Sequence, residues 1–478
     1  MKTQNTQLKP AGSRITSTSA GLLIRSNTYR AAVLALFFAG ATLLSASTAS
    51  ADTITVINTN DSGPGSLRQA LVDANNGDTI NFDSSLNGQK ITLTSGQLIV
   101  DKSVTISGPG VNNLAVDGNA QSRVFYVNPG KTVTISGLTI ANGHGVTWGG
   151  GIYNDHATLI VSNCTVSNNS TRDGYGGGGI VNDAFTYNGN GSATLTVTNC
   201  TLSGNSGGAY TGGGGILNEG WPGSATLTVT NCTFSSNSAD GGGGISNEAG
   251  GNGSATLTVS NSTISGNSAY SGGGISNGVA GHFGGIATLT VTNCTLSGNS
   301  GGGIYNNGVQ GFAGLELGST ILNAGSSGAN ISNNSGTVTS LGYNLSSDNG
   351  GGYLTGPGDQ INTDPMLGPL QDNGGPTFTH ALLPGSPAID AGDPNFTPPP
   401  DYDQRGPGFD RVVNGRIDVG SFEIQSAPTP TPTPTVTPTP TATATPTATV
   451  TPTATPTPTA TPRPSPLPRS RPTPAPRP

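Results

Sequence analysis

The sequence has few charged and few aromatic residues, and this scarcity limits what the chain can be. Charged residues make up 9% and aromatic residues 5% of the 478 positions, whereas about 25% of an ordinary globular protein is charged. No Lys or Arg occurs between Arg172 and Arg405. Residues 52–427 hold 9 basic and 25 acidic side chains, a net charge of −16. Such a body is a poor partner for a phosphate backbone, so we expect no nucleic-acid binding.

Long apolar runs are also scarce. The one clear run, Ala31–Leu44, follows a basic leader and precedes Ala49-Ser50-Ala51. This pattern is typical of a secretory signal peptide cleaved near Ala51. The run is shorter than the about 20 residues that a membrane span needs, although a signal anchor stays open as the alternative. We therefore expect an exported protein, extracellular or at a bacterial cell surface, without a transmembrane helix in the mature chain.

Gly and acidic residues are absent from residues 428–478, which hold 18 of the 34 prolines. Most other positions there are Thr or Ala, so no apolar face exists to bury. Alternating Pro and Thr favours extended polyproline II backbone and stiff spacers. We expect a disordered Pro/Thr-rich tail.

Gly is abundant instead, with 75 copies, and many of them belong to an internal repeat. Copies of a block such as ATLTVTNCTLSGNS start at Ala157, Ala193, Ala225, Ala255 and Ala287, and Gly-rich blocks such as GGGGILNE separate them. In one copy, Leu195 and Val197 alternate with Thr, which predicts a strand. The alternation changes phase at Asn199, which predicts a bend. A third short strand begins at Ile216.

Three short strands and three bends in a period of about 30 residues describe one coil of a parallel β-helix. Helical repeats are excluded because no 3.6-residue period appears, and a propeller blade needs a longer unit. The predicted fold class is an all-β solenoid, a right-handed parallel β-helix of roughly eight to ten coils. The handedness follows from the resemblance described below. We also expect the protein to be a monomer.

Stacked coils place equivalent residues in columns, about 4.8 Å apart. Two columns consist of Asn, whose amides can hydrogen-bond up and down the stack. The first holds Asn163, Asn199, Asn231, Asn261 and Asn293, and the second holds Asn154, Asn182, Asn218, Asn247, Asn277 and Asn306.

The four cysteines, Cys164, Cys200, Cys232 and Cys294, share one position of the repeat. An even number in an exported chain is typical of disulfides. However, the spacing of about 4.8 Å between neighbouring in-register strands exceeds the Cβ separation of about 3.8 Å in a disulfide. We therefore expect four buried free thiols that act as small apolar residues, and no metal site.

The ends of a β-helix must be covered. Ser66–Asn75 predicts a short capping helix, with Ser66 as the N-cap residue and an apolar face of Leu67, Ala70, Leu71 and Ala74. The chain thus divides into a signal peptide (1–51), an N-terminal cap with the first coils (52–130), regular repeats (131–322), the last coils with an irregular C-terminal cap (323–427) and the tail (428–478).

Several segments resemble known bacterial families. Asn60–Phe82 is similar to the N-terminal capping segment of secreted right-handed β-helix proteins, although Gly65, Gln69 and Leu71 replace its usual Cys, Glu and Ile. The repeats resemble those of polymorphic-outer-membrane-type and pectate-lyase-like β-helices. Leu341–Asp348, Asp364–Asp393, Asp403–Gly406 and Asp418–Glu423 resemble the choice-of-anchor Q module of exported or surface proteins. Within this last part we expect Asp390, Asp403 and Arg405 to form an ion-pair network.

One column is acidic and is a candidate functional site, and each of its members directly follows an Asn of the second Asn column. It holds Asp155, Asp183, Glu219 and Glu248. Such neighbours repel unless they point into water or bind a cation. Solvated side chains are the expectation that we favour, with Ca²⁺ or ligand binding and catalysis as alternatives. His156, which follows Asp155, slightly favours a site there, but a surface-loop histidine is the simpler interpretation.

Catalysis has weak support in the sequence. A polysaccharide lyase needs a basic residue near the abstracted proton, and the repeats after Arg172 have none. Arg123, Lys131 and Arg172 lie earlier, without a constellation around them that the sequence reveals.

Aromatic residues in the inserts, Trp148, Tyr210, Trp221 and Tyr270, either stack on sugar rings or cover coil edges. We expect no catalytic residue and no obligatory cofactor. The favoured hypothesis is a non-catalytic adhesin-like protein that contacts polysaccharide or cell-envelope components; a lyase or glycoside hydrolase acting on acidic glycans is the alternative.

Overall fold

A computed structural model describes residues 51–145, 147–171, 176–186, 190–208, 212–281 and 284–425. The expected signal peptide, the Pro/Thr-rich tail, Arg172, Tyr210 and His282 lie outside these residues. Within them, no helix is both long enough and apolar enough to cross a membrane.

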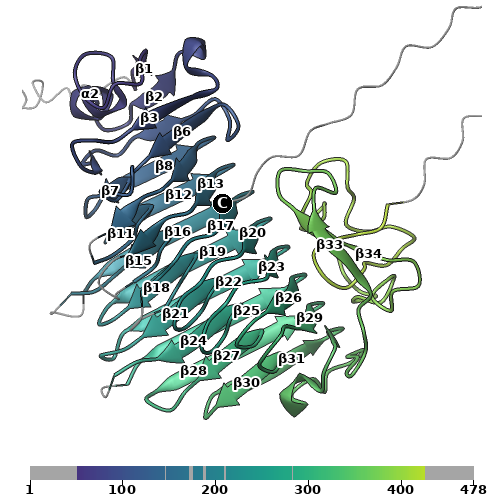
Figure 1. Ribbon diagram of the computed structural model, residues 1–478. Coiled ribbons are helices and arrows are strands. Elements are labelled where there is room, and N and C mark those ends of the chain that lie inside the picture. Colours follow the sequence, from purple (N-terminus) through teal and green to yellow (C-terminus); the bar gives the residue numbers. More distant parts are fainter. Residues whose placement is uncertain are drawn as a thin grey trace, which may run out of the picture. The chain divides into compact units, whose positions relative to one another are not determined.

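The chain forms a parallel β-helix with three long sheets, which confirms the predicted fold class (Figure 1). Sheet A has 11 strands, sheet B has 10 and sheet C has nine, in agreement with roughly eight to ten coils. Sheet A contains β1 (Thr53–Val56), β2 (Thr79–Phe82), β5 (Thr105–Ser107), β8 (Thr132–Ser136), β12 (Thr158–Ser162), β16 (Ser192–Thr198), β19 (Ser224–Thr230), β22 (Ser254–Ser260), β25 (Ile286–Thr292), β28 (Phe312–Gly318) and β31 (Thr337–Gly342).

The other two sheets complete each coil. Sheet B contains β3 (Gln89–Thr92), β6 (Leu114–Asp117), β9 (Thr139–Ala141), β13 (Thr165–Ser167), β17 (Thr201–Ser203), β20 (Thr233–Ser235), β23 (Thr263–Ser265), β26 (Thr295–Asn299), β29 (Ile321–Ala324) and β32 (Leu345–Ser346). Sheet C contains β4 (Leu98–Val100), β7 (Phe125–Val127), β11 (Ile152–Asp155), β15 (Ile180–Asp183), β18 (Ile216–Gly220), β21 (Ile245–Ala249), β24 (Ile275–Val279), β27 (Ile304–Asn307) and β30 (Ile331–Asn334). A small pair, β10 (His144–Gly145) and β14 (Ser170–Thr171), runs beside them.

One coil shows why the repeat folds this way. Leu195 and Val197 of β16 point inward and are completely buried, as are Cys200 and Leu202 across the bend. Asn199 has a φ of 53°, in the left-handed region that Asn tolerates, and this bend changes which alternate residues face inward. Burying each Leu or Val contributes about 1.5–3 kcal/mol. Because every coil repeats this inward set, the stack has one continuous core.

Three Asn columns satisfy polar groups along the stack. In the buried column that starts at Asn154, each amide nitrogen donates to the next amide oxygen, at 2.7 Å for the Asn182–Asn218 pair. At the left-handed bends, Asn199, Asn231 and Asn261 each donate to the Asn of the preceding coil. The sequence analysis missed a third column, which is fully or almost fully buried and holds Asn169, Asn205, Asn237, Asn267 and Asn299.

The four cysteines are buried and unpaired. The Cys200 thiol donates to the Thr198 carbonyl at 3.1 Å and accepts the Cys164 backbone N–H at 3.3 Å. The hydrogen bond with Cys200, followed by burial, raises the pKa of Cys164, whereas burial is the largest cause of the raised pKa of Cys200. The column therefore packs as apolar core and makes weak hydrogen bonds with the bend backbone.

The N-terminal cap contains helix α2 (Leu67–Asp73), and a 3-10 turn, η1 (Ser84–Leu86), follows it. Ser66 is the N-cap residue, and its hydroxyl accepts the Gln69 N–H at 3.2 Å. Leu67, Ala70 and Leu71 are buried in the same core as the first coils. This confirms the predicted capping helix, although the Gln69 side chain bonds to Asp73 and does not complete a capping box.

The C-terminal part has two different roles. Residues 347–363, including the turn η2 (Gly350–Gly352), follow the last coil, and Tyr353 and Leu354 pack on its core. Residues 364–425, which we name the C-terminal module, contain the antiparallel pair β33 (Leu367–Gln371) and β34 (Thr379–Leu382). The module does not continue the stack: it packs along the outer face of sheet B (Figure 1).

Gln404 is the centre of this lateral contact. Its amide nitrogen donates to the Cys232 carbonyl at 3.2 Å and to the Thr233 hydroxyl at 2.9 Å. Its amide oxygen accepts the Thr263 hydroxyl at 2.6 Å. His380 bonds to Ser265 in the same sheet, and burial lowers the pKa of this histidine. An irregular segment is thus fixed to the flank of regular coils by buried polar contacts.

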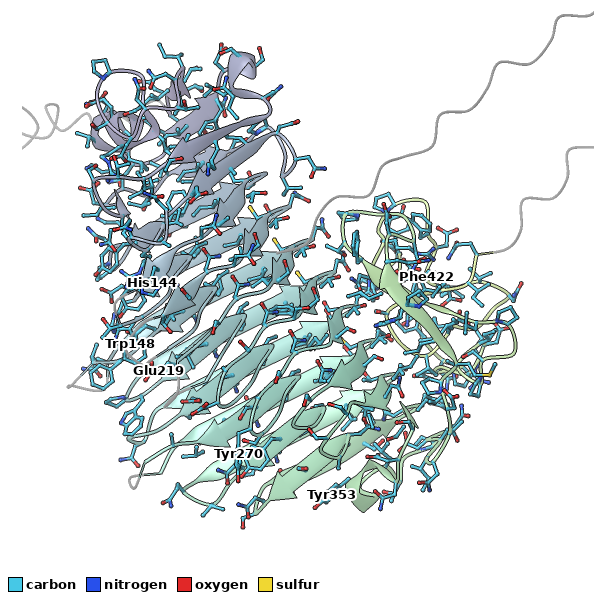
Figure 2. The ribbon with its side chains drawn as sticks, viewed as in Figure 1. His144, Trp148, Glu219, Tyr270, Tyr353 and Phe422 are labelled. Carbon is cyan, nitrogen blue, oxygen red and sulfur yellow. The ribbon has the colours of Figure 1, made fainter. Side chains whose placement is uncertain are left out.

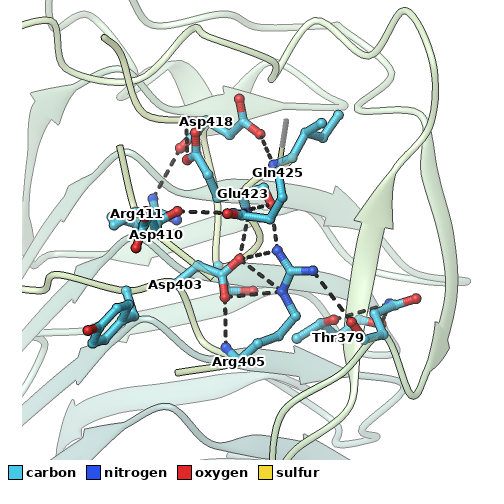
Figure 3. A network of polar contacts seen from close by, with 12 residues as sticks. Thr379, Asp403, Arg405, Asp410, Arg411, Asp418, Glu423 and Gln425 are labelled. Carbon is cyan, nitrogen blue, oxygen red and sulfur yellow. Dashed lines mark hydrogen bonds and ion pairs between the residues drawn. The ribbon is translucent and has the colours of Figure 1, made fainter. Parts of the chain in front are cut away.

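Within the module, Arg405 pairs with Asp403, as the sequence predicted (Figure 3). The guanidinium lies between the rings of Phe409 and Phe422, 4.0 and 3.8 Å from their centroids. The expectation that Asp390 belongs to this pair was wrong. Among the described residues, the Asp390 carboxylate forms no ion pair; only its backbone N–H reaches the neighbouring acids, donating to Asp418 at 2.7 Å.

Candidate functional site

The acidic column predicted from the sequence lies at the ends of four neighbouring strands of sheet C. Asp155 is opposite Asp183, Asp183 is opposite Glu219, and Glu219 is opposite Glu248 in the parallel register. These positions alternate with the buried Asn column, so the carboxylates are on the outer side of the sheet. Figure 2 labels Glu219 on the same flank of the stack as His144 and Trp148.

Two tyrosines that the sequence analysis missed precede this column. Tyr126 and Tyr153 are opposite each other on β7 and β11, and their ring centroids are 5.4 Å apart. The Tyr126 hydroxyl donates to Asp155, and the Tyr153 hydroxyl donates to Asp183. Each tyrosine therefore reaches the carboxylate of the following coil. Burial and the hydrogen bond to Asp155 raise the pKa of Tyr126 to about 12.

The favoured expectation of solvated carboxylates was wrong for the middle of the column. Asp183 is 4% exposed and Glu219 is 7% exposed. The outward residues beside them, Val181 and Leu217, are buried too, so this part of sheet C is covered. Desolvation raises the pKa of Asp183 and of Glu219. The repeat pattern alone does not show this burial, because it predicts only that these positions face outward.

Asp183 and Glu219, which are buried, and Glu248, which is half-buried, differ in how their carboxylates are hydrogen-bonded. Asp183 accepts the Phe185 N–H at 2.6 Å in addition to the Tyr153 hydroxyl. Glu248 accepts the Ser246 hydroxyl at 2.8 Å and the Gly212 N–H at 3.3 Å. One oxygen of Glu219, Oε2, is buried without a hydrogen-bond partner. A neutral carboxylic acid is the form that burial favours at Glu219.

The column does not gather into a chelating group. Across the described ranges, no three His, Cys, Asp or Glu side chains are placed so that they could hold one metal ion. His156 contacts Asp155 through Nδ1, and its Nε2 is buried without a partner. The side chain of His156 is 19% exposed, so it is not the freely solvated loop histidine that we expected.

Arg123 completes a cluster that the sequence did not reveal. Its guanidinium carbon is 4.8 Å from the centroid of the Tyr153 ring and 5.6 Å from that of Tyr126. It donates to Gln97 Oε1 at 2.9 Å and to the Gly149 carbonyl at 2.8 Å. Desolvation lowers the pKa of Arg123. In the sequence, Tyr153 stands two residues before Asp155, on the same face of the strand. This was a signal for the cluster, but the Gly-rich segment around Tyr153 drew attention to the repeat instead.

A pocket of about 290 Å³ opens beside this cluster. Its lining residues are polar or charged: Gln97, Gln121, Ser122, Arg123 and His144. His144 Nδ1 is 2.8 Å from the Ser170 hydroxyl, which fixes the ring at the β10–β14 pair. The pocket therefore offers a guanidinium, two amides, a hydroxyl and an imidazole to one small ligand.

The aromatic inserts have different environments. The Trp221 ring covers the backbone of Gly250, Gly251 and Gly281, where a Cβ would meet ring atoms within 2.8 Å. This residue covers coil edges, one of the two roles expected. Tyr270 is 92% exposed, and nothing among the described residues covers its ring. The Trp148 carbonyl accepts a hydrogen bond from Arg123, and the Trp148 ring packs against the backbone of Gly176.

Comparisons with known proteins give little beyond the fold. No family model matches the chain, and a search of curated proteins finds no relative. Among solved structures, pectate lyase Pel9A is 14% identical, with 78% of this chain and 96% of that chain covered and a TM-score of 0.44. The ORF18 protein of Geobacillus virus E2 is 13% identical, with 68% and 65% covered and a TM-score of 0.31. These scores do not bear on function, which rests on this chain's own residues.

Proposed function

We propose that the protein is an exported, non-catalytic β-helix protein that contacts carbohydrate in an adhesin-like manner. The observation that carries this proposal is the Arg123 guanidinium, which lies over the Tyr126 and Tyr153 rings and lines the adjoining polar pocket. Among the described carboxylates, none forms an ion pair with Arg123. Its nitrogens donate to Gln97 Oε1 and to the carbonyls of Trp148 and Gly149, which hold the guanidinium in place without neutralising its charge, so an anionic group at the pocket would be attracted to it.

The pocket suits a sugar better than an apolar ligand. Gln97, Gln121 and Ser122 provide donors and acceptors of the kind that bind sugar hydroxyls. The tyrosine pair beside Arg123 provides an aromatic edge. A saccharide unit that carries a carboxylate or sulfate would pair with the guanidinium, whereas a neutral unit would use the amides alone.

The carboxylates support a binding role over a catalytic one. Asp155 and Asp183 are each engaged by a tyrosine hydroxyl, and Asp155 also contacts His156. Glu219 is almost fully buried. A glycosidase needs two carboxyl groups that both reach the substrate, and this column presents no such exposed pair among the described residues.

A glycoside hydrolase or polysaccharide lyase is the second candidate. One observation favours it: Glu219 is a buried acid with an unpartnered oxygen and a raised pKa, between Asp183 and Glu248. A general acid in a glycosidase has such a raised pKa. Release of reducing ends or unsaturated products from polygalacturonate or alginate, abolished by Asp183→Asn, would establish this candidate and refute the non-catalytic role.

Binding can be tested with the mature chain and immobilised glycans, including polygalacturonate, alginate and neutral xylan. We expect retention on at least one of them, lost in Arg123→Ala. Lys102→Ala is the matched control, because it removes one positive charge from another coil, where, among the described residues, Lys102 pairs with Asp101 alone. Equal retention of wild type and Arg123→Ala, or no retention on any glycan, would contradict the proposal.

Export and surface attachment belong to the same proposal. The apolar run before Ala51, the Pro/Thr-rich tail and the resemblance of the C-terminal module to choice-of-anchor Q segments support it. Cell fractionation of the full chain and of a chain that ends at Gln425 tests it. We expect both to be exported and only the full chain to stay with the envelope. Retention of the full chain in the cytoplasm would contradict export.

A further inference from the structure

The outer face of sheet A carries a regular grid of hydroxyl side chains that the proposed function does not use. On the four central strands, β16, β19, β22 and β25, three outward positions repeat in direct register. Eleven of these twelve positions are Thr and the twelfth is Ser. They are Thr194, Thr196, Thr198, Thr226, Thr228, Thr230, Thr256, Thr258, Ser260, Thr288, Thr290 and Thr292.

The grid has two fixed repeats. Neighbouring strands are about 4.8 Å apart, and alternate residues of one strand are about 6.6 Å apart. No bulge interrupts the pairing from β16 to β25. Thr288 Oγ1 donates to Thr256 Oγ1 at 3.2 Å, and the Thr230 and Ser260 hydroxyls are 3.2 Å apart. Since β-branched side chains have restricted χ1 angles, the hydroxyl and methyl groups hold defined positions.

The chemistry of this face excludes most ligands. None of its twelve positions is charged, so an ionic partner finds no counter-charge. None is aromatic, so a sugar ring finds no stacking platform. At one edge of the grid, Thr230, Ser260 and Thr292 line a pocket of about 540 Å³ together with Phe396 and Pro399 of the C-terminal module. At the other nine positions, each Thr offers one methyl group and one hydroxyl that both donates and accepts. This combination can hold ordered water at regular intervals, without the charges that would reorient it.

We propose that this threonine grid binds ice. Water molecules held between the hydroxyl and methyl groups would share the repeats of the grid, and these are close to the repeats of the oxygen lattice on an ice surface. The rigid core behind sheet A keeps the repeats constant over four coils. The grid ends at β28, where Gly314 and Glu316 replace Thr and a hollow of about 220 Å³ opens.

The test measures how much of the full chain is taken up by slowly growing ice from dilute solution. We expect enrichment in the ice fraction and inhibition of ice recrystallisation. Thr228→Asp, at the centre of the grid, is expected to reduce uptake to the level of an unrelated protein. Ser276→Asp is the matched control, because it adds the same charge to the outer face of sheet C, and it should leave uptake unchanged.

A second variant guards against misfolding. Thr228→Leu adds no charge, but it removes the hydroxyl and raises the side chain above the plane, so we expect it to reduce uptake as well. Thermal unfolding curves must show that both Thr228 variants fold. Wild-type uptake no greater than that of an unrelated protein would refute the proposal, and so would uptake that folded Thr228 variants retain. Binding of this face to crystalline cellulose and not to ice would also refute it.

Discussion

The Tyr153 hydroxyl donates a hydrogen bond to Asp183 on the next coil, and both side chains are on the covered side of sheet C. Tyr126 makes the same bond to Asp155 one coil earlier. This diagonal pairing supplies a donor to acids that the stack has withdrawn from water. It is the local arrangement on which the properties of the site depend.

Removing that donor should destabilise the protein. Tyr153→Phe leaves Asp183 with the Phe185 N–H as its remaining described donor, and the expected loss is about 1–3 kcal/mol. Denaturant unfolding measures it. Tyr305→Phe is the control, since Tyr305 occupies the same column on β27 and its hydroxyl makes no hydrogen bond to another described residue. Equal stability of wild type and Tyr153→Phe would contradict this reading.

Glu219 should make stability depend on pH. Burial, and then the charges of Asp183 and Glu248, raise its pKa above the ordinary value of 4.5. Above pH 4.5 the unfolded chain loses this proton while the folded chain keeps it, so stability falls as pH rises toward the folded-state pKa. Glu219→Gln removes this contribution. We expect the melting temperature of the variant to decline less between pH 5 and 8.

Comparing the two proteins isolates Glu219 from other groups. The lowered pKa of His380 acts in the opposite direction below pH 6.5, and the raised pKa of Glu423, about 8, acts in the same direction. Both contributions are present in wild type and variant and cancel in the difference. Parallel melting curves across this range would show that Glu219 ionises normally in the folded protein.

Docking of the C-terminal module should depend on Gln404. Gln404→Ala removes bonds to Cys232, Thr233 and Thr263 and leaves buried groups without partners, at a cost of about 1–3 kcal/mol for each unsatisfied group. We expect faster proteolysis and hydrogen exchange within residues 364–425 and unchanged protection of the coils. Gln371→Ala, an exposed change within the module, is the control and should exchange like wild type.

The two kinds of Asn column should respond differently to substitution. Asn218→Ala removes one buried amide from a continuous column, leaves Asn182 without its acceptor and should cost about 1–3 kcal/mol. Asn199→Gly keeps a residue that tolerates the positive φ of the bend and should cost less. Chemical denaturation of both variants gives the comparison. A larger loss for Asn199→Gly would reverse the assigned roles.

Thiol reactivity should follow unfolding. All four cysteines are buried and free, and burial raises the pKa of Cys294 to about 12. Because the thiolate is the reactive form, we expect almost no reaction with a thiol reagent in the folded protein. Four thiols should react in denaturant without reductant. Two or fewer would indicate disulfides.

The sequence predicted the structure of the coil well because every coil buries the same inward positions and bends at the same place. Leu195, Val197 and Asn199 recur at one spacing, and stacking converts that spacing into columns. The third Asn column, at Asn205, follows the same period and was readable in the repeat. The burial of Asp183 and Glu219 was not, because the repeat predicts that these positions face outward and does not tell what lies over them. Gln404 contacts Thr233 across 171 residues of sequence, a separation that no periodicity encodes.

The lateral docking of the C-terminal module has a mechanical consequence. Four residues before Gln425, Ser421 bonds to Thr263 and Thr295 on β23 and β26, ahead of the final strands of sheet B. A force applied to the chain at Gln425 therefore reaches the coils of β23 and β26 before it reaches those of β29 and β32. The load would be shared in shear by several coils at once, and the last coil would be protected from being peeled away.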